Sequence, residues 1–277
     1  MNYVELNISV PSAEIAEILT AELSELPFDS FVPERDRLKA YIPQDALVDC
    51  KEEADAILAD YGITDCRYVQ IEAQNWNALW ESNFEPVDVD GRVLIRAPFH
   101  APSTTAEFEV VIMPKMSFGT GHHATTKMMV EMILDSDLKG KVGLDMGSGT
   151  GVLAIAACKC GAERLDAVDI DDFAYENCGE NIVTNGVAER ITPIMGDARA
   201  IAGRKYDFIL ANINRNILLG DMDNYLKSLN KGGEIFFSGF LDSDIEAMCA
   251  AAAERNLTLH FERHDNGWAA LSFVKPL

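Results

Sequence analysis

From Val142 onward, short apolar runs alternate with amphipathic stretches, and this alternation constrains the fold more than any other feature of the sequence. The apolar runs are "VGLDMG", "RLDAVDI", "ITPIMGDA", "YDFILANI" and "EIFFSGF", and helices are predicted over 152–160, 173–185 and 217–229. Short apolar strands separated by helices are typical of a parallel sheet covered on both faces. Near the end, "LTLHFERH" and "WAALSFVK" are separated only by "DNG", a hairpin turn signal. We therefore predict an α/β fold whose doubly wound sheet finishes with an antiparallel hairpin.

The first 75 residues form a separate pattern. "NYVELNISV" alternates like a strand, and "SAEIAEILTAELSEL" has helical spacing behind a capping Ser12. Two short strands are predicted in "DSFVPERDRLKAYIP", a second helix in "QDALVDCKEEADAILADYG", and a last strand in "CRYVQIEAQ". The order βαββαβ predicts a ferredoxin-like domain. Because that fold hosts many functions, it identifies none by itself.

The stretch between these two patterns is rich in aromatic residues. Trp76, Trp80 and Phe84 recur at helical spacing, and a strand is predicted around 92–95. Ordinary packing explains this spacing at least as well as a ligand role. We expect two domains, over 1–75 and 94–277, joined by a linker over 76–93.

Composition excludes several classes of protein. The net charge of −22, from 45 acidic and 23 basic residues, disfavours direct nucleic-acid binding and suits a basic partner, although acidic residues also simply keep a protein soluble. No apolar run reaches the roughly 18 residues that span a bilayer. The N-terminus lacks the features of a signal peptide, so we expect a cytoplasmic protein without membrane contact. The six cysteines include no C-x-x-C pair, and no metal site is expected.

The glycine-rich stretch "LDMGSGTGVLAIAA" joins the first apolar strand of the sheet to the first helix. Ligands of open α/β sheets bind at the carboxyl ends of strands, where Gly147 and Gly149 would let the backbone approach closely. Asp169 ends the next strand, at a spacing that suits hydrogen bonds from ribose hydroxyls. The third glycine of a dinucleotide motif is replaced by Val152. Because a pyrophosphate needs an open helix N-terminus, this favours S-adenosylmethionine over NAD.

Two further strand ends carry polar candidates. Asp197, in "MGDAR", could accept a hydrogen bond from an adenine amino group, with a helix cap or turn as the plainer alternative. Asn212 and Asn214, in "LANINRN", follow the fourth strand. An amide has both donors and an acceptor, so Asn212 could orient an incoming amine, although a turn role is the alternative.

A second glycine-rich stretch, "SFGTGHHATTK", precedes the first one and holds two glycines, three threonines and two adjacent histidines. Read alone, it suggests a phosphate or metal site. A metal hydrolase that uses His122 and His123 is disfavoured, because adjacent histidines rarely converge on one ion and no acidic or cysteine ligand lies at a useful spacing. We expect this stretch to form a second wall of the cofactor site.

The glycine loop, with Asp145 and Asp169 and the hairpin-ended sheet, resembles a class I methyltransferase. "FGTGHHATT", "NWNALWESNFEPV" and the small N-terminal domain together resemble the bacterial methyltransferases of large-subunit ribosomal protein eleven, over essentially the whole chain. This resemblance implies trimethylation, from S-adenosylmethionine, of lysine side chains and the N-terminal amine of that protein, free or on the ribosome. It also implies that the N-terminal domain grips the substrate and that a linker lets it move.

Carried over residue by residue, the resemblance implies that Thr126, Gly147, Asp169 and Asn212 contact S-adenosylmethionine, with Thr125 as an alternative to Thr126. The family usually has Asn-Ile-Leu after the fourth strand, whereas this chain has Asn-Ile-Asn. This departure makes the surroundings of the methyl-accepting amine less well defined.

Methyl transfer from a sulfonium needs a neutral amine held in line with the methyl group. A lysine, with an unperturbed pKa of about 10.4, must first lose a proton, and the sulfonium charge and desolvation both lower that pKa. A dedicated base is therefore not required, and we expect Asn212 to orient the amine. The absence of Asn-Pro-Pro-aromatic after the fourth strand favours an aliphatic amine over a nucleobase. The alternatives are a methyltransferase for another protein or a small molecule, and a binding module joined to a cofactor sensor.

Overall fold

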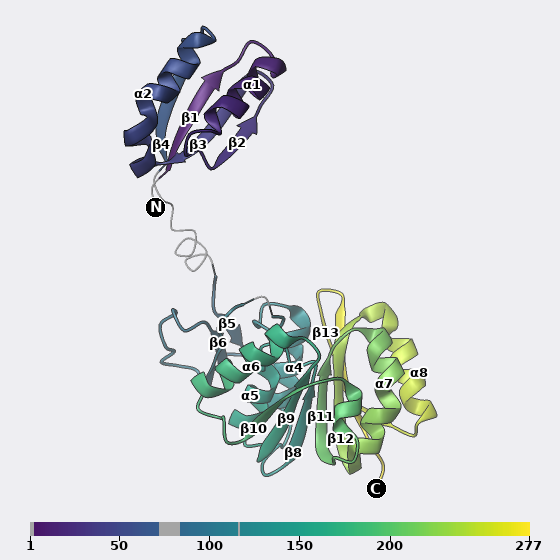
Figure 1. The fold of residues 1–277 in the computed structure, drawn as a ribbon. Helices are drawn as coiled ribbons and strands as arrows, with labels where there is room; N and C mark the ends of the chain where they lie inside the picture. The colour runs from purple at the N-terminus through teal and green to yellow at the C-terminus, as the bar shows by residue number, and fades with distance from the viewer. Residues whose placement is uncertain (1–2, 72–83, 116) are drawn as a thin grey trace. The chain divides into compact units, whose positions relative to one another are not determined.

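The computed structural model describes residues 3–71, 84–115 and 117–277. Contacts divide the chain into two compact units, Met1–Phe84 and Glu85–Leu277 (Figure 1). This division falls inside the stretch 76–93 that was expected to link two domains. The aromatic positions Trp76 and Trp80 of the expected short helix lie outside the described residues.

The first unit is a four-stranded antiparallel sheet with two helices on one face. Its strand order is β2-β3-β1-β4, and its elements are β1 (Tyr3–Ser9), α1 (Ala13–Leu23), β2 (Ser30–Pro33), β3 (Arg37–Pro43), α2 (Gln44–Asp60) and β4 (Cys66–Ile71). Alternate side chains of β1, such as Leu6 and Ile8, are buried against both helices. Helix α1 begins behind Ser12, whose hydroxyl accepts a hydrogen bond from the backbone N–H of Ile15.

The second unit is built around a seven-stranded mixed sheet of order β10-β9-β8-β11-β12-β14-β13. Its strands are β8 (Val142–Met146), β9 (Arg164–Asp169), β10 (Ile191–Met195), β11 (Tyr206–Asn212), β12 (Leu229–Leu241), β13 (Thr258–Asp265) and β14 (Trp268–Val274). Neighbouring strands run parallel from β10 through β9, β8 and β11 to β12, whereas β14 pairs antiparallel with both β12 and β13. The strand order reverses at β8, which lies between β9 and β11, so the ends of these strands form a topological switch point.

Helices cover both faces of this sheet (Figure 1). One face carries α4 (Ala124–Leu134), α5 (Val152–Lys159) and α6 (Asp172–Thr184), and the other carries α7 (Arg215–Ser228) and α8 (Ile245–Glu254). Short 3-10 turns cover Ala198–Ile201 and Asp242–Asp244. The sheet and its helices confirm the predicted α/β fold.

A small three-stranded sheet precedes α4. It consists of β5 (Val87–Val89), β6 (Val93–Arg96) and β7 (Phe108–Val111), in which β5 and β6 pair antiparallel and β6 and β7 pair parallel. Strand β5 therefore lies within the stretch 76–93 that was expected to act as a linker. Its core residues pack into the same cluster as α4 and α5, so this sheet belongs to the second unit.

The described residues contain neither a membrane-spanning helix nor a cluster of metal ligands. No helix within the described part of the chain is long and apolar enough to cross a membrane. Within residues 3–71, 84–115 and 117–277, no group of three or more His, Cys, Asp or Glu side chains could hold a metal ion. All six cysteines are unpaired.

Candidate functional site

A cavity of about 480 Å³ lies at the carboxyl ends of β8, β9 and β11, where the strand order reverses. This volume is in the range of about 300–1,000 Å³ that is usual for sites of small molecules and cofactors. The residues predicted from the sequence that line it are Gly147, Gly149, Asp169, Asp197 and Asn212. The structure thus brings together candidates that are separated by up to 65 positions along the chain.

The loop between β8 and α5 forms one wall of the cavity. Gly149 has a φ of +52°, in the left-handed region that favours glycine, and a Cβ there would lie 2.3 Å from the carbonyl oxygen of Phe118. The N–H of Gly149 donates to Oδ2 of Asp169 at 2.8 Å, which fixes the carboxylate at the end of β9. The backbone of the glycine loop therefore orients the acidic side chain that was expected to meet a ribose.

The second glycine-rich stretch docks on this loop. The backbone N–H of Thr150 donates to the carbonyl of Phe118 at 2.9 Å, and its hydroxyl donates to the carbonyl of Gly119 at 2.6 Å. A Cβ at Gly119, whose φ is +105°, would lie 2.7 Å from that hydroxyl oxygen. Ser117 and Phe118 consequently line the cavity together with the glycine loop.

The two adjacent histidines have different partners, and both shape the second stretch. Nε2 of His122 donates to the carbonyl of Glu85 at 2.9 Å, so its Nδ1 accepts from the hydroxyl of Thr120 at 3.1 Å. His123 caps α4, because its Nδ1 accepts the N–H of Thr125, and its ring lies 4.7 Å from that of Trp268. Their side chains are thus engaged within the protein, and neither lines the cavity.

Thr125 and Thr126 are both buried in the first turn of α4 and lie behind the lining of the cavity. The Thr125 hydroxyl lies 2.8 Å from Nδ1 of His123. The Thr126 hydroxyl instead accepts from Nδ2 of Asn212 at 3.5 Å. Of the two threonines, Thr126 is therefore the one in contact with a residue of the cavity.

Asn212 has an unused hydrogen-bonding group. Its Oδ1 is buried and has no hydrogen-bond partner among the described residues. An amide oxygen can accept two hydrogen bonds, and leaving it unpaired costs about 1–3 kcal/mol. The Oδ1 atom of Asn212 is therefore available to accept a hydrogen bond at the end of β11, while its Nδ2 is bonded to Thr126.

Asp197 lies at the edge of the cavity and already has partners. Nη2 of Arg199 lies 2.7 Å from its Oδ2, and its side chain accepts the backbone N–H of Arg199. This ion pair lowers the pKa of the Asp197 carboxyl. Asp197 thus caps the 3-10 turn that follows it, which is the alternative role considered from the sequence.

Asp145 lies directly behind the glycine loop and is completely buried. Its Oδ2 accepts the N–H of Ala154 at 3.0 Å, which supports the first turn of α5, whereas Oδ1 has no partner among the described residues. Burial raises the pKa of this carboxyl to about 7. The carboxyl is therefore held near the point at which it gains or loses its proton at neutral pH.

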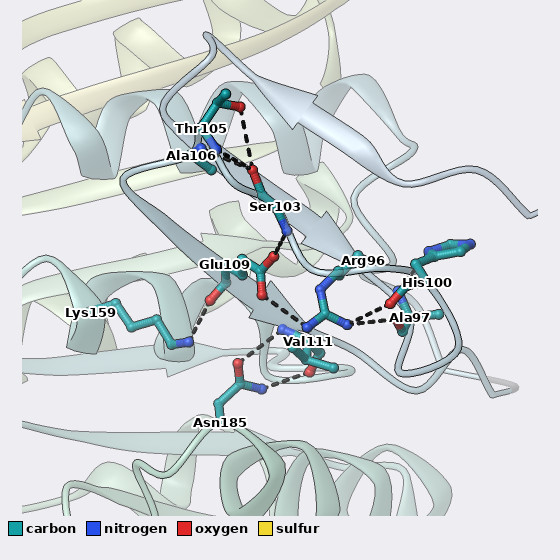
Figure 2. Close-up of polar contacts among 10 residues, drawn as sticks. All are labelled: Arg96, Ala97, His100, Ser103, Thr105, Ala106, Glu109, Val111, Lys159 and Asn185. Atoms are coloured by element: carbon teal, nitrogen blue, oxygen red, sulfur yellow. Dashed lines mark hydrogen bonds and ion pairs between the residues drawn. The ribbon is translucent and has the colours of Figure 1, made fainter.

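Asparagines on α6 and at its C-cap, which were not predicted from the sequence, anchor the chain that leads into the second glycine-rich stretch. Asn185 donates to the carbonyl of Val111 and accepts its N–H, so that it extends the edge of β7 (Figure 2). One turn earlier, Asn181 accepts the N–H of Met113 at 2.9 Å and donates to the carbonyl of Thr150 at 2.9 Å. Asparagines four apart on a helix were the available sequence signal.

Strand β7 is further held by ion pairs and hydrogen bonds of Glu109. Figure 2 shows Arg96 of β6 beside the Glu109 carboxylate, at 2.9 Å, and Lys159 of α5 at the Glu109 carbonyl. Arg96 also donates to the carbonyls of Ala97 and His100. The pKa of Glu109 is lowered, chiefly by the hydrogen bond from Arg96. The segment before the cavity is thus fixed at both β7 and α6.

Two side chains of α7, Asp221 and Tyr225, also line the cavity and were not predicted from the sequence. A carboxylate and an aromatic residue four apart in a helix resemble any amphipathic pattern. Only the fold, which packs α7 against β11, β12 and the turn at 198–201, could identify them.

Comparison with known proteins identifies relatives over nearly the whole length. The family model "Ribosomal protein L11 methyltransferase (PrmA)" matches residues 12–276. A ribosomal protein L11 methyltransferase of Porphyromonas gingivalis is 43% identical, over 93% of this chain and 90% of the relative. One of Bacteroides fragilis is 40% identical, over 99% of this chain and 100% of the relative.

A solved structure has the same fold. The crystal structure of a ribosomal protein L11 methylase from Lactobacillus delbrueckii subsp. bulgaricus superposes with a TM-score of 0.65 and 26% sequence identity. It covers 70% of this chain and 100% of the solved chain.

Proposed function

Because the chain belongs to the family of ribosomal protein L11 methyltransferases, we propose that its cavity binds S-adenosylmethionine and that it trimethylates lysine side chains and the N-terminal amine of ribosomal protein L11. Family membership makes it an S-adenosylmethionine-dependent enzyme that methylates ribosomal protein L11. When bound, S-adenosylmethionine supplies an activated methyl group. The place of action is the cytoplasm, on the free protein or on the ribosome.

The charge of the cavity carries the cofactor proposal. Four carboxylates and no basic side chain are found among its described lining residues, and the carboxylates are those of Asp169, Asp171, Asp197 and Asp221. Such a lining favours a cation and disfavours the pyrophosphate of a dinucleotide. S-Adenosylmethionine carries a sulfonium and an ammonium group, so the lining fits it.

The glycine loop and Asp169 would hold the nucleoside part of the cofactor. Each carboxylate oxygen of Asp169 has capacity for a further hydrogen bond beyond those it accepts from Gly149 and Asp171, and this capacity suits ribose hydroxyls. Backbone atoms of Gly147 and Gly149 would lie against the ligand. Thr126 is proposed to act through Asn212, whereas Thr125 is already engaged by His123.

Asn212 is proposed to orient the methyl-accepting amine. Its unpaired Oδ1 can accept an N–H of the substrate in the first and second transfers, after which the neutral dimethylamine has no N–H left to donate, while Thr126 is hydrogen-bonded to the other side of the amide. This leaves the lone pair of a neutral amine free to point at the methyl group. The proton leaves the amine beforehand, because desolvation and the neighbouring positive charge lower the pKa of a lysine.

The N-terminal unit is proposed to be a ferredoxin-like domain that grips the substrate. Its helices cover one face of its sheet, and polar side chains such as Glu5, Asn7 and Tyr41 occupy the other. The chain's net charge of −22 complements a basic ribosomal protein. Deleting the first unit should abolish methylation of ribosomal protein L11 while leaving S-adenosylhomocysteine binding intact. Methylation that persists without this unit would remove its role.

Mass spectrometry of the product tests the proposed function. The purified chain is incubated with S-adenosylmethionine and ribosomal protein L11 from a strain that lacks this methylation, and the peptides are then sequenced. We expect lysines and the N-terminal amine that carry three methyl groups each. Products that stop at one methyl group would refute trimethylation, and labelling of a different protein would refute the substrate.

A further inference from the structure

Two side chains of α7 line the cavity, and neither has been given a hydrogen bond to the cofactor in the arrangement proposed above. Asp221 and Tyr225 are four residues apart and therefore face the same side of the helix, and both line the cavity. Tyr225 is completely buried, and its hydroxyl has no hydrogen-bond partner among the described residues. An unpaired buried hydroxyl is unfavourable, so its position points to a ligand that accepts a hydrogen bond from it.

Asp221 differs from the other carboxylates of the cavity. Asp169 is held by the glycine loop, Asp171 is exposed and caps α6, and Asp197 is paired with Arg199. Asp221 is half-buried; its Oδ1 accepts from Nδ2 of Asn224 at 3.2 Å, and its Oδ2 has no partner in the described part of the chain. It thus offers a free acceptor beside the Tyr225 donor.

The surroundings of this pair suit a flat ring. Met146 of β8 and Val168 of β9 line the cavity, and both belong to the same core cluster as Tyr225. This part of the cavity therefore lies between the sheet and α7 and has apolar walls. If Asp169 holds a ribose at the end of β9, the base attached to that ribose has this apolar region beside it.

We propose that Asp221 and Tyr225 recognise the adenine base of S-adenosylmethionine, with the carboxylate accepting from the exocyclic amino group and the hydroxyl donating to a ring nitrogen. The inference rests on the proposed function, because it requires the cofactor in this cavity. Adenine has an amino donor next to a ring acceptor, which complements an acceptor and a donor on the protein. Hypoxanthine has the reverse pattern, a carbonyl acceptor beside an N–H donor. The pair therefore takes the role that the sequence suggested for Asp197.

Calorimetric titration of the full chain with S-adenosylhomocysteine and S-inosylhomocysteine tests this recognition. The wild-type chain should bind the adenosyl compound at least about tenfold more tightly, since the inosyl compound places a carbonyl against the carboxylate. In Asp221→Asn the amide can donate to that carbonyl, so the preference should fall to within about threefold. Asp223→Asn is the matched control, because Asp223 lies on the same helix but is exposed and bonded to Arg255. It should keep the wild-type preference.

Tyr225→Phe separates recognition from folding. Its hydroxyl makes no hydrogen bond in the described structure, so the variant should melt no lower than the wild type without ligand. It should nevertheless bind S-adenosylhomocysteine about 3- to 10-fold more weakly. Binding equal to that of the wild type would remove Tyr225 from the site.

The outcomes distinguish this inference from the function on which it rests. If the wild-type chain binds neither nucleoside, the proposed cofactor site itself is wrong. If it binds S-adenosylhomocysteine but Asp221→Asn keeps the full preference, or Asp197→Asn abolishes it, only the assignment of the base to Asp221 is overturned. A change in Asp221→Asn confined to the KM for ribosomal protein L11 would likewise overturn it.

Discussion

The two glycine-rich loops of the cavity obtain their shapes in different ways. The loop between β8 and α5 connects a buried strand to a buried helix, and its own backbone conformation places the Gly149 N–H on Asp169. The stretch 117–123 lies outside any helix or strand. It is held by hydrogen bonds from Thr150, by His122 and His123, and by the asparagines of α6 behind it.

The sequence motif of the first loop specifies its conformation, whereas the conformation of the second loop depends on contacts with distant parts of the fold. A loop fixed by its own backbone should fail when a single φ is made unfavourable. A loop fixed by docking should fail gradually, as its contacts are removed one at a time. Substitutions in the two loops and beside them should therefore differ in the size of their effects.

Gly149→Ala should have the largest effect. The alanine would have to keep the left-handed backbone conformation of Gly149, with a φ of +52°. Its Cβ would also lie 2.3 Å from the Phe118 carbonyl oxygen, so both loops must move. A displacement of about 1 Å at such a site can lower the rate by about 100-fold, and we expect at least that loss of methyl transfer.

Gly140→Ala is the matched control for Gly149→Ala. Gly140 has a φ of +70°, but a Cβ there meets nothing within 4 Å. It should lower stability by about 1–2 kcal/mol and leave methyl transfer unchanged. Equal activity losses in the two variants, measured with radiolabelled S-adenosylmethionine, would show that backbone strain alone explains the result.

Asn212→Ala should lower kcat by about 10- to 100-fold while changing S-adenosylhomocysteine affinity by no more than about threefold. The reason is that the unpaired Oδ1 is proposed to act on the substrate amine, where the two loops and β11 meet. Steady-state kinetics and calorimetry measure the two quantities separately. Wild-type turnover in this variant would mean that Asn212 does not orient the amine.

Thr150→Val should have a smaller effect, because it removes one docking hydrogen bond and leaves the backbone of the glycine loop in place. A bond of about 0.5–1.5 kcal/mol corresponds to a rise of about 2- to 13-fold in the KM for S-adenosylmethionine. Hydrogen exchange should become faster in 117–123 but not in 147–151. Thr184→Val, which removes an exposed threonine hydroxyl on α6, is the control and should change neither. Equal acceleration in both loops would contradict the contrast.

Asp145→Asn should change the pH dependence of stability. The folded-state pKa of Asp145 is raised from 3.8 to about 7, so its stabilising contribution is complete below about pH 4 and is lost as the pH rises through 7. The variant cannot ionise, and its melting temperature relative to the wild type should therefore rise between pH 5 and pH 8, by a few degrees. A constant difference across this range would show that Asp145 does not titrate there.

The sequence predicted the elements that follow a regular alternation of apolar runs and the residues that belong to a local motif. The alternation of apolar runs predicted the α/β sheet, and the spacing of Gly147 and Asp169 predicted which strand ends would meet. Helix α7 begins at Arg215 and not at 217, because Asn214 supplies its cap. That start could not be read from apolar spacing alone.

The rest of the site depends on contacts between distant segments. Asn181 joins the chain at Met113 to Thr150, and no local pattern indicates such partners. Asp221 and Tyr225 become cavity residues only because α7 packs against β11, β12 and the turn at 198–201. The physical chemistry of "FGTGHHATT" alone suggested a metal site, because the stretch contains two histidines. Its likeness to a known family was needed to assign it to the cofactor site.

A crystal structure of the full chain with S-adenosylhomocysteine would show whether the glycine loop and the stretch 117–123 both line one cofactor site. We expect ligand density that contacts both Phe118 and the glycine loop, with the ribose at Asp169 and the base toward α7. Density elsewhere on the protein, or density that contacts the glycine loop while 117–123 stays clear of it, would contradict this expectation.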